Sequence, residues 1–301
     1  MDISKLISGL SPTTPVLIAG PTASGKSDLA LRIAEQQGGI VINADAIQVY
    51  ADWRILTARP SVQDEARAPH VLYGHVARDV VYSVGDWLRD LEPYLDAGPR
   101  PIIVGGTGLY FTALTQGLAR IPETPDAVRA EATARITDHG HRSLIPDLDA
   151  DTRSRIDLEN PMRVQRAWEV LRSTGTGLAA WQDATPPPRL SLADVQAFVV
   201  DAPKDWLTPR IEHRFARMIT AGALDEARAN KEGWTPDLPS SKAIGAAELM
   251  AVLDGHMIIE QASERASILT RQFAKRQRTW FRSRMGHWTW LEAAELEVAI
   301  T

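Results

Sequence analysis

Four short apolar runs, separated by segments with helical spacing, form the main pattern of the chain. The runs occupy residues 16–19, 39–45, 101–104 and 195–200. Each is short, rich in β-branched residues and bounded by turn residues, which is typical of buried strands. Strands that alternate with helices along a chain favour a parallel sheet. The pattern therefore predicts an α/β fold, a parallel sheet flanked by helices.

The segments between these runs predict helices of uneven length. Leu29 and Ile33 recur at helical spacing after the first run, and Gly38 ends this helix. Further helices are predicted over about 82–96 and 208–231. Residues 51–77 carry an irregular pattern with scattered prolines, so we expect mostly loop with one short helix there.

The character of the chain changes between residues 121 and 187. Prolines separate short helical stretches that are rich in arginine and acidic residues, and no strand-like run appears before Pro186. We therefore expect two domains, a core of residues 1–120 plus 188–301 and a helical insertion subdomain of residues 121–187.

Residues 102–119 carry no charge over eighteen positions, which raises the question of a membrane span. Four closely spaced residues, Gly105, Gly106, Thr107 and Gly108, divide this segment into a short strand and a helix. We therefore expect that this segment does not span a membrane and that the protein has no membrane partner.

Composition narrows the class of protein. The 301 residues are 44% hydrophobic and 24% charged, which is ordinary for a soluble globular protein. The sequence contains no cysteine, which excludes disulfides and thiolate metal sites, and we expect no structural metal centre. The first residues lack the basic and apolar segments of a signal peptide, so we expect a cytoplasmic protein. We also expect a monomer.

The segment after the first predicted strand matches the phosphate-binding pattern G-x-x-x-x-G-K-[ST]. Its eight residues, called the cradle below, are Gly20, Pro21, Thr22, Ala23, Ser24, Gly25, Lys26 and Ser27. The glycines let successive backbone N–H groups point into one concavity, where an anion binds at the start of a helix. Lys26 would reach the terminal phosphate, and the Ser27 hydroxyl would ligate Mg²⁺. The motif predicts that the parallel sheet is P-loop NTPase-like. It is typical of nucleotide-binding and ATP-binding proteins, and it leaves open whether a nucleotide or another diphosphate is bound.

Three polar positions at strand ends are candidates for chemistry, because the carboxyl ends of parallel strands line the ligand crevice. Asp45 could act as a general base or as a water-mediated Mg²⁺ ligand, or it could cap a helix together with Gln48. Thr107 follows two glycines and could donate to a phosphate oxygen, or it could cap a helix. Asp201 resembles a metal-side carboxylate, although most such residues are ordinary strand-end acids.

Basic residues gather near the end of a chain whose net charge is −5. Residues 261–290 hold seven basic residues and one acidic residue, a local charge of +6. Arg271, Lys275, Arg278 and Arg282 fall on one stripe of a predicted helix, along about 16 Å of its length. This spacing suits a nucleic-acid backbone better than one small anion. A second stripe of Arg210, Arg214 and Arg217 could reach a diphosphate or pair with acids.

Four motifs in chain order resemble those of bacterial tRNA dimethylallyltransferases (isopentenyltransferases). They are the cradle, the segments 45–50 and 104–110, and the basic segment 270–282. The resemblance covers roughly residues 15–290. It implies transfer of the prenyl group of dimethylallyl diphosphate, with Mg²⁺, to the exocyclic N6 amine of the adenine on the 3′ side of the anticodon.

The resemblance assigns the roles of catalytic residues to Asp45 and Thr107. It assigns tRNA contacts to Asp45, Ala46, Ile47, Gln48, Thr107, Arg129, Met162, Arg163, Val164, Gln165, Arg166, Lys275, Arg276, Gln277, Arg278, Thr279, Trp280, Phe281 and Arg282. The partners implied are dimethylallyl diphosphate and the anticodon arm of tRNA, which we expect to lie between the core and the helical insertion.

Two departures from the family pattern leave part of the site open. Ala246 and Ala247 follow Gly245, where the family usually has an aromatic and a basic residue, and Leu56 stands where glycine is usual. Two other classes also remain. A small-molecule or nucleoside kinase would explain the cradle without the basic helix, and a non-catalytic RNA-binding protein would explain the helix without Lys26 and Asp45.

Overall fold

A single parallel sheet forms the centre of the core in the computed structural model, which describes residues 3–96 and 98–297. Its strand order is β3-β2-β4-β1-β5-β6, and every neighbouring pair is parallel. The strands are β1 (Val16–Ala19), β2 (Ile40–Asn43), β3 (His70–Val71), β4 (Pro101–Gly105), β5 (Gln196–Asp201) and β6 (Thr289–Glu292). The predicted α/β fold class is confirmed.

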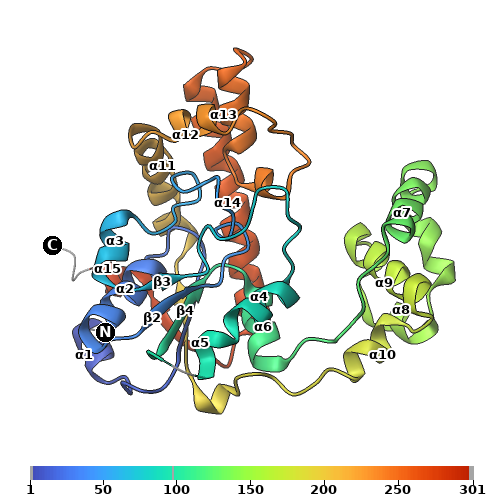
Figure 1. Cartoon of the computed structure of the whole chain (residues 1–301), viewed down its shortest axis with the longest axis horizontal. Coiled ribbons are helices and arrows are strands. Elements are labelled where there is room, and N and C mark those ends of the chain that lie inside the picture. Colours follow the sequence, from blue (N-terminus) through green and yellow to red (C-terminus); the bar gives the residue numbers. More distant parts are fainter. Residues whose placement is uncertain (1–2, 97, 298–301) are drawn as a thin grey trace. The chain divides into compact units, whose positions relative to one another are not determined.

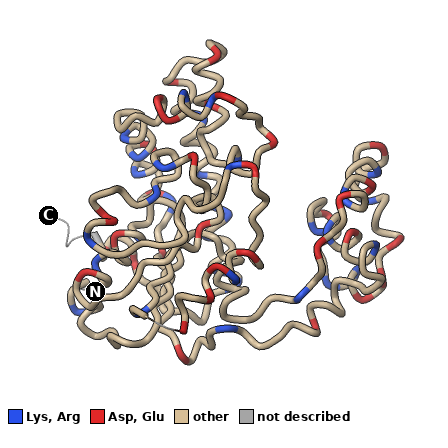
Figure 2. Tube along the Cα trace, viewed as in Figure 1, with Lys and Arg blue, Asp and Glu red and all other residues tan. Residues whose placement is uncertain are grey.

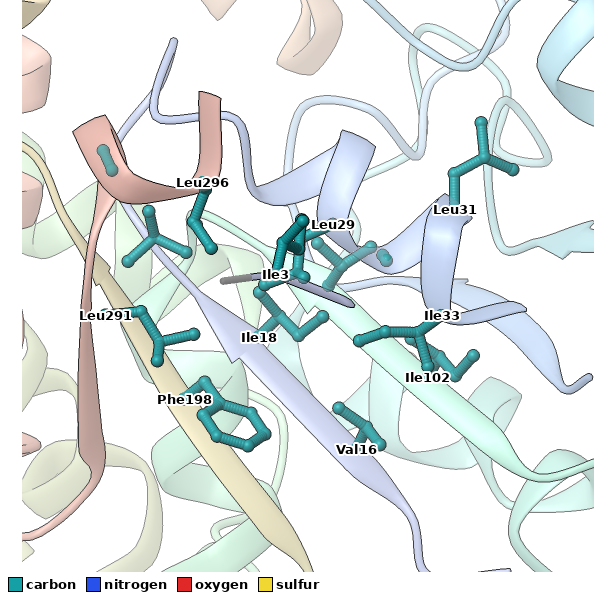
Figure 3. Packing of buried hydrophobic residues seen from close by; sticks show 14 of the residues in the cluster. Ile3, Val16, Ile18, Leu29, Leu31, Ile33, Ile102, Phe198, Leu291 and Leu296 are labelled. Atoms are coloured by element: carbon teal, nitrogen blue, oxygen red, sulfur yellow. The ribbon is translucent and has the colours of Figure 1, made fainter. Parts of the chain in front are cut away.

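Successive side chains of each strand point to opposite faces of the sheet, so every strand contributes to two hydrophobic clusters. Val16, Ile18 and Ile102 pack against Leu29 and Ile33 on one face (Figure 3). Leu17, Ile42 and Ile103 belong to the cluster on the other face, with the large side chains Trp87 and Phe111. This burial on both faces explains the continuous apolar runs in the sequence.

Helices cover both faces of the sheet (Figure 1): α1, α2 and α15 contribute to one cluster, α4 and α6 to the other. The helices of the core are α1 (Ile3–Ser8), α2 (Lys26–Gln37), α3 (Val62–Arg67), α4 (Val84–Leu91), α5 (Pro93–Asp96), α6 (Gly108–Gln116), η2 (Leu192–Asp194), α11 (Lys204–Thr220), α12 (Ala223–Ala229), η3 (Pro239–Lys242), α13 (Ala246–Leu253), α14 (Ile259–Arg284) and α15 (Ala293–Glu297). A further cluster joins α11, α12, α13 and α14 through residues such as Phe215, Leu249 and Ala266.

Two predicted helices are each divided in the structure. The segment expected over 82–96 is α4 followed by α5, because Pro93 has no N–H to continue the first helix. The segment expected over 208–231 is α11 followed by α12, with Gly222 at φ 99° in the left-handed region between them. The predicted helix after the cradle and the short helix α3 are both present.

The two strands at the edges of the sheet, β3 and β6, were not expected from the sequence. Neither carries an apolar run, because β3 is short and half-buried and β6 exposes most of its side chains. The uncharged segment 102–119 forms β4 and α6. Among residues 3–96 and 98–297, no helix is long and apolar enough to cross a membrane.

The chain divides into two compact units. One unit comprises the chain up to Thr115 and from Leu190 onward, and the other runs from Gln116 to Arg189. The second unit contains α7 (Asp126–His139), η1 (His141–Asp147), α8 (Ala150–Arg155), α9 (Pro161–Thr174) and α10 (Leu178–Asp183). Leu144, Val164 and Trp168 belong to its own hydrophobic cluster. Both acidic and basic residues occur along its helices (Figure 2).

Candidate active site

The cradle joins β1 to α2 through a turn that two glycines make possible. Gly25 has φ 86° at the start of α2, where a side chain would strain the backbone. Gly20 has another reason to lack a side chain, since a Cβ there would lie 2.8 Å from Ser24 Oγ and 3.2 Å from Val200 Cβ. The cradle is therefore held between its own serine and β5, the strand next to β1 in the sheet.

Lys26 lies over this turn with its Nζ donating to the Pro21 carbonyl at 3.1 Å. Burial lowers the pKa of Lys26 from 10.5 to about 8; the field of Asp45 raises it and that of Arg214 lowers it further. A desolvated cation of this kind gains most when an anion arrives. Ser27, directly after it, is exposed at the start of α2 and free to turn its hydroxyl toward a ligand.

The Asp45 loop is fixed by hydrogen bonds from three sides. Asn43 accepts from the Asp45 backbone N–H at 2.8 Å and donates to the Asp45 carbonyl at 2.9 Å. Asp45 Oδ1 accepts from the backbone N–H of Ile47 at 2.9 Å. This Asx turn leads into no helix, so the capping interpretation of Asp45 with Gln48 is wrong. The Gln48 side chain instead donates to the carbonyls of Thr57 and Ala58.

Thr107 holds the same loop from the neighbouring strand. Its Oγ1 accepts from the Ala46 backbone N–H at 2.9 Å, and its own N–H donates to the Ala44 carbonyl at 3.2 Å. The half-buried hydroxyl of Thr107 therefore joins the segment after β4 to the segment after β2. Thr107 also directly precedes α6, although its hydroxyl bonds to Ala46. A Cβ at Gly105 would collide with the Ala44 backbone, so this glycine allows the close approach.

Two adjoining cavities open beside the cradle. The first, of about 620 Å³, is lined by Lys26, Ser27 and a set of cations that includes Arg32, Arg59, Arg210, Arg214 and Arg217. The second, of about 300 Å³, has mainly apolar walls from Ile47, Leu56, Ile211, Phe215, Met218, Ile244 and Phe273, with Asp45 and Thr22 at its side. Arg214 and Gln48 line both cavities. A cationic chamber therefore adjoins an apolar chamber that contains a carboxylate.

The arginine stripe of α11 lies along the first cavity, a position that is compatible with contact to a diphosphate. Arg210, Arg214 and Arg217 all line it. The Arg210 guanidinium stacks on the Trp206 ring at 3.6 Å. Burial lowers the pKa of Arg214 below its ordinary value, an effect that the charge of Asp45 opposes.

The basic residues of helix α14 lie in different environments. Arg271 pairs with Glu212 at 2.8 Å, and Arg282 lies 3.6 Å from Asp201. The acidic partners absent from the helix sequence are thus supplied by α11 and β5. Asp201 lies beside an arginine, which favours the strand-end interpretation over the metal-side one. Of the stripe, Lys275 is exposed and Arg278 half-buried.

Two residues expected to contact tRNA on α14 are directed into the protein. Phe281 is 1% exposed and belongs to a sheet-face cluster. Gln277 is 6% exposed, and its amide bonds to the cradle. Trp280 is half-buried against Gly108, where a Cβ would collide with its ring. In this structure Phe281 and Gln277 therefore offer little side-chain surface to an RNA, whereas Arg276 and Thr279 are exposed.

The segment 162–166 is divided in the same way between surface and core. Val164 is fully buried in the cluster of the helical unit, so its side chain offers no contact surface. Gln165 donates to Glu169 at 2.9 Å, and Arg166 donates to Thr124 at 2.7 Å. The exposed side chains are Met162, Arg163 and Arg166, and exposed Arg129 on α7 lies 4.0 Å from Asp126. Periodicity could have identified Val164 as a core position.

A long-range contact that the sequence does not predict holds residues 54–56, and Leu56 of this loop lines the apolar cavity. Glu226 on α12 accepts hydrogen bonds from three successive backbone N–H groups, those of Arg54, Ile55 and Leu56, at 2.7–2.9 Å. A carboxylate that fills a nest of amides fixes the loop strongly. No local pattern could reveal it, because the partners lie about 170 residues apart.

The two departures from the family pattern meet in space. Leu56 is 4% exposed, and its Cδ1 would lie 2.8 Å from a Cβ placed on Gly245, whose φ is 100°. Ala246 belongs to the same cluster. The leucine and the small residues therefore pack as one unit in the wall of the apolar cavity.

Comparisons with known proteins identify the family of the chain. The family model "IPP transferase" matches residues 48–284, and the model "Isopentenyl transferase" matches residues 14–72. A tRNA dimethylallyltransferase of Ruegeria sp. (strain TM1040) is 62% identical over 96% of this chain and 97% of its own, and one of Dinoroseobacter shibae is 60% identical over 94% and 96%.

Solved structures give the same result. A eukaryotic dimethylallyltransferase acting on tRNA matches with a TM-score of 0.78 and 26% identity, over 93% of this chain and 74% of that one. The tRNA isopentenylpyrophosphate transferase of Bacillus halodurans matches with a TM-score of 0.64 and 29% identity, over 93% and 90%. With the cradle, the carboxylate and the two cavities in place, the chain belongs to the IPP transferase family.

Proposed function

We propose that the chain transfers the dimethylallyl group of dimethylallyl diphosphate to the N6 amine of the adenine on the 3′ side of the anticodon in tRNA. The observation that carries this proposal is the adjacency of the two cavities, one cationic beside the cradle and one apolar with Asp45 in its wall. A prenyl diphosphate has the same division into an anionic and an apolar part.

The diphosphate would lie in the cationic cavity, held by the cradle amides, Lys26 and Arg214. Mg²⁺ is part of the proposal. Among the described residues no group of three or more His, Cys, Asp or Glu side chains could hold a metal, so the fit depends on Ser27 and the oxygens of the substrate. An exposed serine at the start of α2 meets this need, because Mg²⁺ commonly keeps several waters and few protein ligands. Bound there, it would neutralise charge on the leaving diphosphate.

Asp45 is placed to take the proton that the reaction releases. In the transfer, the adenine N6 forms a bond to C1 of the prenyl group, the bond from C1 to the diphosphate oxygen breaks, and a proton leaves N6. Asp45 Oδ1 is held by the Ile47 amide, while the described residues provide no hydrogen bond to Oδ2. That oxygen is therefore available as the general base. The adenine must leave its stack to reach it.

Arg214 connects the two halves of the reaction, since it lines both cavities. A cation at this position stabilises negative charge as it grows on the leaving oxygen. Burial makes the positive charge of Arg214 unfavourable without a ligand. A bound diphosphate would therefore stabilise this charge strongly. The prenyl chain would occupy the apolar walls at Leu56 and Phe215.

The kinase alternative is not favoured. A phosphoryl transfer would use the cradle and the cationic cavity but gives no role to an apolar chamber beside Asp45. A non-catalytic RNA-binding protein would need neither cavity. We place the enzyme in the cytoplasm, acting as a monomer, as part of the same proposal.

The test is incubation of the purified chain with Mg²⁺, radiolabelled dimethylallyl diphosphate and unmodified tRNA, with Asp45→Asn as the matched variant. Label should enter the tRNA, and the variant should be slower by about 10² to 10⁴, the usual contribution of a general base. Diphosphate binding by the variant should be retained, which shows an intact cradle. ATP turnover without tRNA labelling would instead assign the chain to the kinase class.

A further inference from the structure

A single buried amide joins the cradle to the turn that follows β4. Gln277 Oε1 accepts from the Thr22 backbone N–H at 2.9 Å, and its Nε2 donates to the Gly106 carbonyl at 2.9 Å. Gln277 is 6% exposed although it stands in the middle of the basic helix α14. Both hydrogen-bonding ends of its amide are therefore occupied inside the protein.

The contact also determines the residue types around it. A Cβ at Gly106 would collide with Gln277 Nε2 and lie 3.2 Å from Asp45 Oδ2. The amide of Gln277 thus lies next to the general base as well as the cradle. Glycine at position 106 leaves the space that the glutamine fills.

The hydrogen bond changes the function of one cradle amide. The Thr22 N–H is committed to Gln277, so it holds the position of the loop and does not point to a ligand. Thr22 also lines the apolar cavity with Asp45, so a shift of its backbone would move the walls of both chambers. A displacement of about 1 Å is enough to cost a reaction much of its rate.

We propose that Gln277 is a positioning residue that fixes the cradle against the Gly106 turn, and that it makes no contact with RNA. This inference rests on the proposed diphosphate site. The neighbours Lys275 and Arg276 are exposed and remain available to a nucleic acid. We call the hydrogen-bonded contact of Gln277 with Thr22 and Gly106 the brace. A single turn of α14 therefore carries both this buried brace and exposed basic residues.

The test replaces the amide by a side chain of similar length without hydrogen bonds, Gln277→Met. Gln272→Met is the matched control, because Gln272 is exposed on the same helix. Binding of inorganic diphosphate with Mg²⁺, measured without tRNA, should weaken at least about tenfold in Gln277→Met, because the Thr22 N–H and the Gly106 carbonyl both lose their partner. In the transfer assay kcat should fall as well, while tRNA affinity and its salt dependence should stay within about twofold.

A second measurement needs no variant. The Thr22 amide of the wild-type chain should exchange its hydrogen far more slowly than an exposed loop amide, because its partner is buried. Gln277→Glu should weaken diphosphate binding at least as much as Gln277→Met, since a carboxylate cannot donate to the Gly106 carbonyl and adds a negative charge beside the anion site.

The outcomes separate the two proposals. A wild-type chain that binds no diphosphate would overturn the proposed function and this inference with it. A wild type that binds diphosphate, with equal affinity in Gln277→Met or with rapid exchange at Thr22, would overturn this inference alone. Weakened tRNA binding with unchanged diphosphate binding would show that Gln277 is an RNA contact.

Discussion

Arginines in the helical unit and arginines around the cradle stand in opposite surroundings. In the helical unit, Arg155 pairs with Asp151 and Asp183 at 2.8 and 2.6 Å, and Arg142 pairs with Glu159 at 2.7 Å. Around the cradle, Lys26 donates to the Pro21 carbonyl and Arg214 to the Thr57 carbonyl at 3.4 Å. Arg155 and Arg142 are thus partnered by carboxylates, whereas the printed hydrogen bonds of Lys26 and Arg214 go to neutral carbonyl oxygens.

The protonation equilibria follow this difference. Hydrogen bonds with Asp183 and Asp151 raise the pKa of Arg155. Burial lowers the pKa of Lys26 and of Arg214 instead. Exposed pairs stabilise a fold weakly, whereas desolvated cations destabilise it until an anion binds. The comparison shows that the cationic cavity is maintained at a cost to stability, as a functional site is expected to be.

The largest effect should follow from Arg214→Met. Loss of a charge-assisted contact should weaken diphosphate binding by about 2 kcal/mol, roughly thirtyfold. The melting temperature should stay unchanged or rise, because an apolar side chain replaces a desolvated cation. Calorimetry measures the affinity for diphosphate, and thermal unfolding measures the melting temperature. Arg172→Met, which removes a pair with Glu131 in the helical unit, is the control and should leave binding unchanged. A lower melting temperature for Arg214→Met would contradict the idea that the buried arginine destabilises the fold.

The next effect is a pH dependence from Lys26. In the free chain Lys26 loses its proton as the pH rises through about 8, and bound diphosphate favours the charged form. Affinity for diphosphate should therefore be highest below pH 8 and fall by up to about tenfold per pH unit above it. Stability of the free chain should change in the other direction, rising between pH 8 and 10.5, because the unfolded chain binds the proton more tightly.

The control for this titration is Lys26→Arg, whose guanidinium stays charged over the whole range. Titration of the diphosphate itself is common to both proteins and cancels in the ratio of their affinities. Parallel pH profiles for the two would show that Lys26 does not titrate near 8.

A smaller effect should distinguish the two halves of the α14 stripe. Lys275 and Arg278 have no acidic partner among the described residues, whereas Arg271 and Arg282 lie beside Glu212 and Asp201. Lys275→Ala with Arg278→Ala should weaken tRNA binding and reduce its salt slope by about one to two. Arg271→Ala with Arg282→Ala should reduce the slope less, because neighbouring acids already neutralise those charges. Equal slopes for both double variants would contradict the distinction.

The smallest effect is expected in the helical unit. Arg155→Ala should lower the free energy of unfolding only slightly, because exposed pairs stabilise a fold weakly. Urea titrations at low and high salt measure it, and the difference should shrink at high salt. A loss of several kcal/mol that persists in salt would show that these pairs resemble a buried network.

Local signals in the sequence were sufficient for the parallel sheet and for the cradle, because both depend on short apolar runs and glycines. The edge strand β6 lacked such a run, and the division at Gly222 needed the backbone angle that only the structure supplies. Asp45 was identified as a candidate, but the bond from Thr107 to the Ala46 amide joins segments 61 residues apart.

Long-range contacts also explain the errors at the site. The acidic partners of Arg271 and Arg282 belong to other elements, so counting charges within α14 overestimated its free cations. Resemblance to a family carried Gln277 and Val164 over as RNA contacts, because a linear motif does not record which side of a helix is buried. The apolar cavity is assembled from six separate stretches, and no single one of them predicts it.

The brace between Thr22 and Gln277 has a consequence for the order in which a newly made chain matures. The two residues are 255 positions apart, so the cradle emerges from the ribosome long before its brace is translated. The central strand β1 also waits for β5, which follows the whole helical unit in the chain. The helical unit has a hydrophobic cluster of its own and can collapse first. A nascent chain should therefore acquire a rigid anion site only when its last long helix has been synthesised.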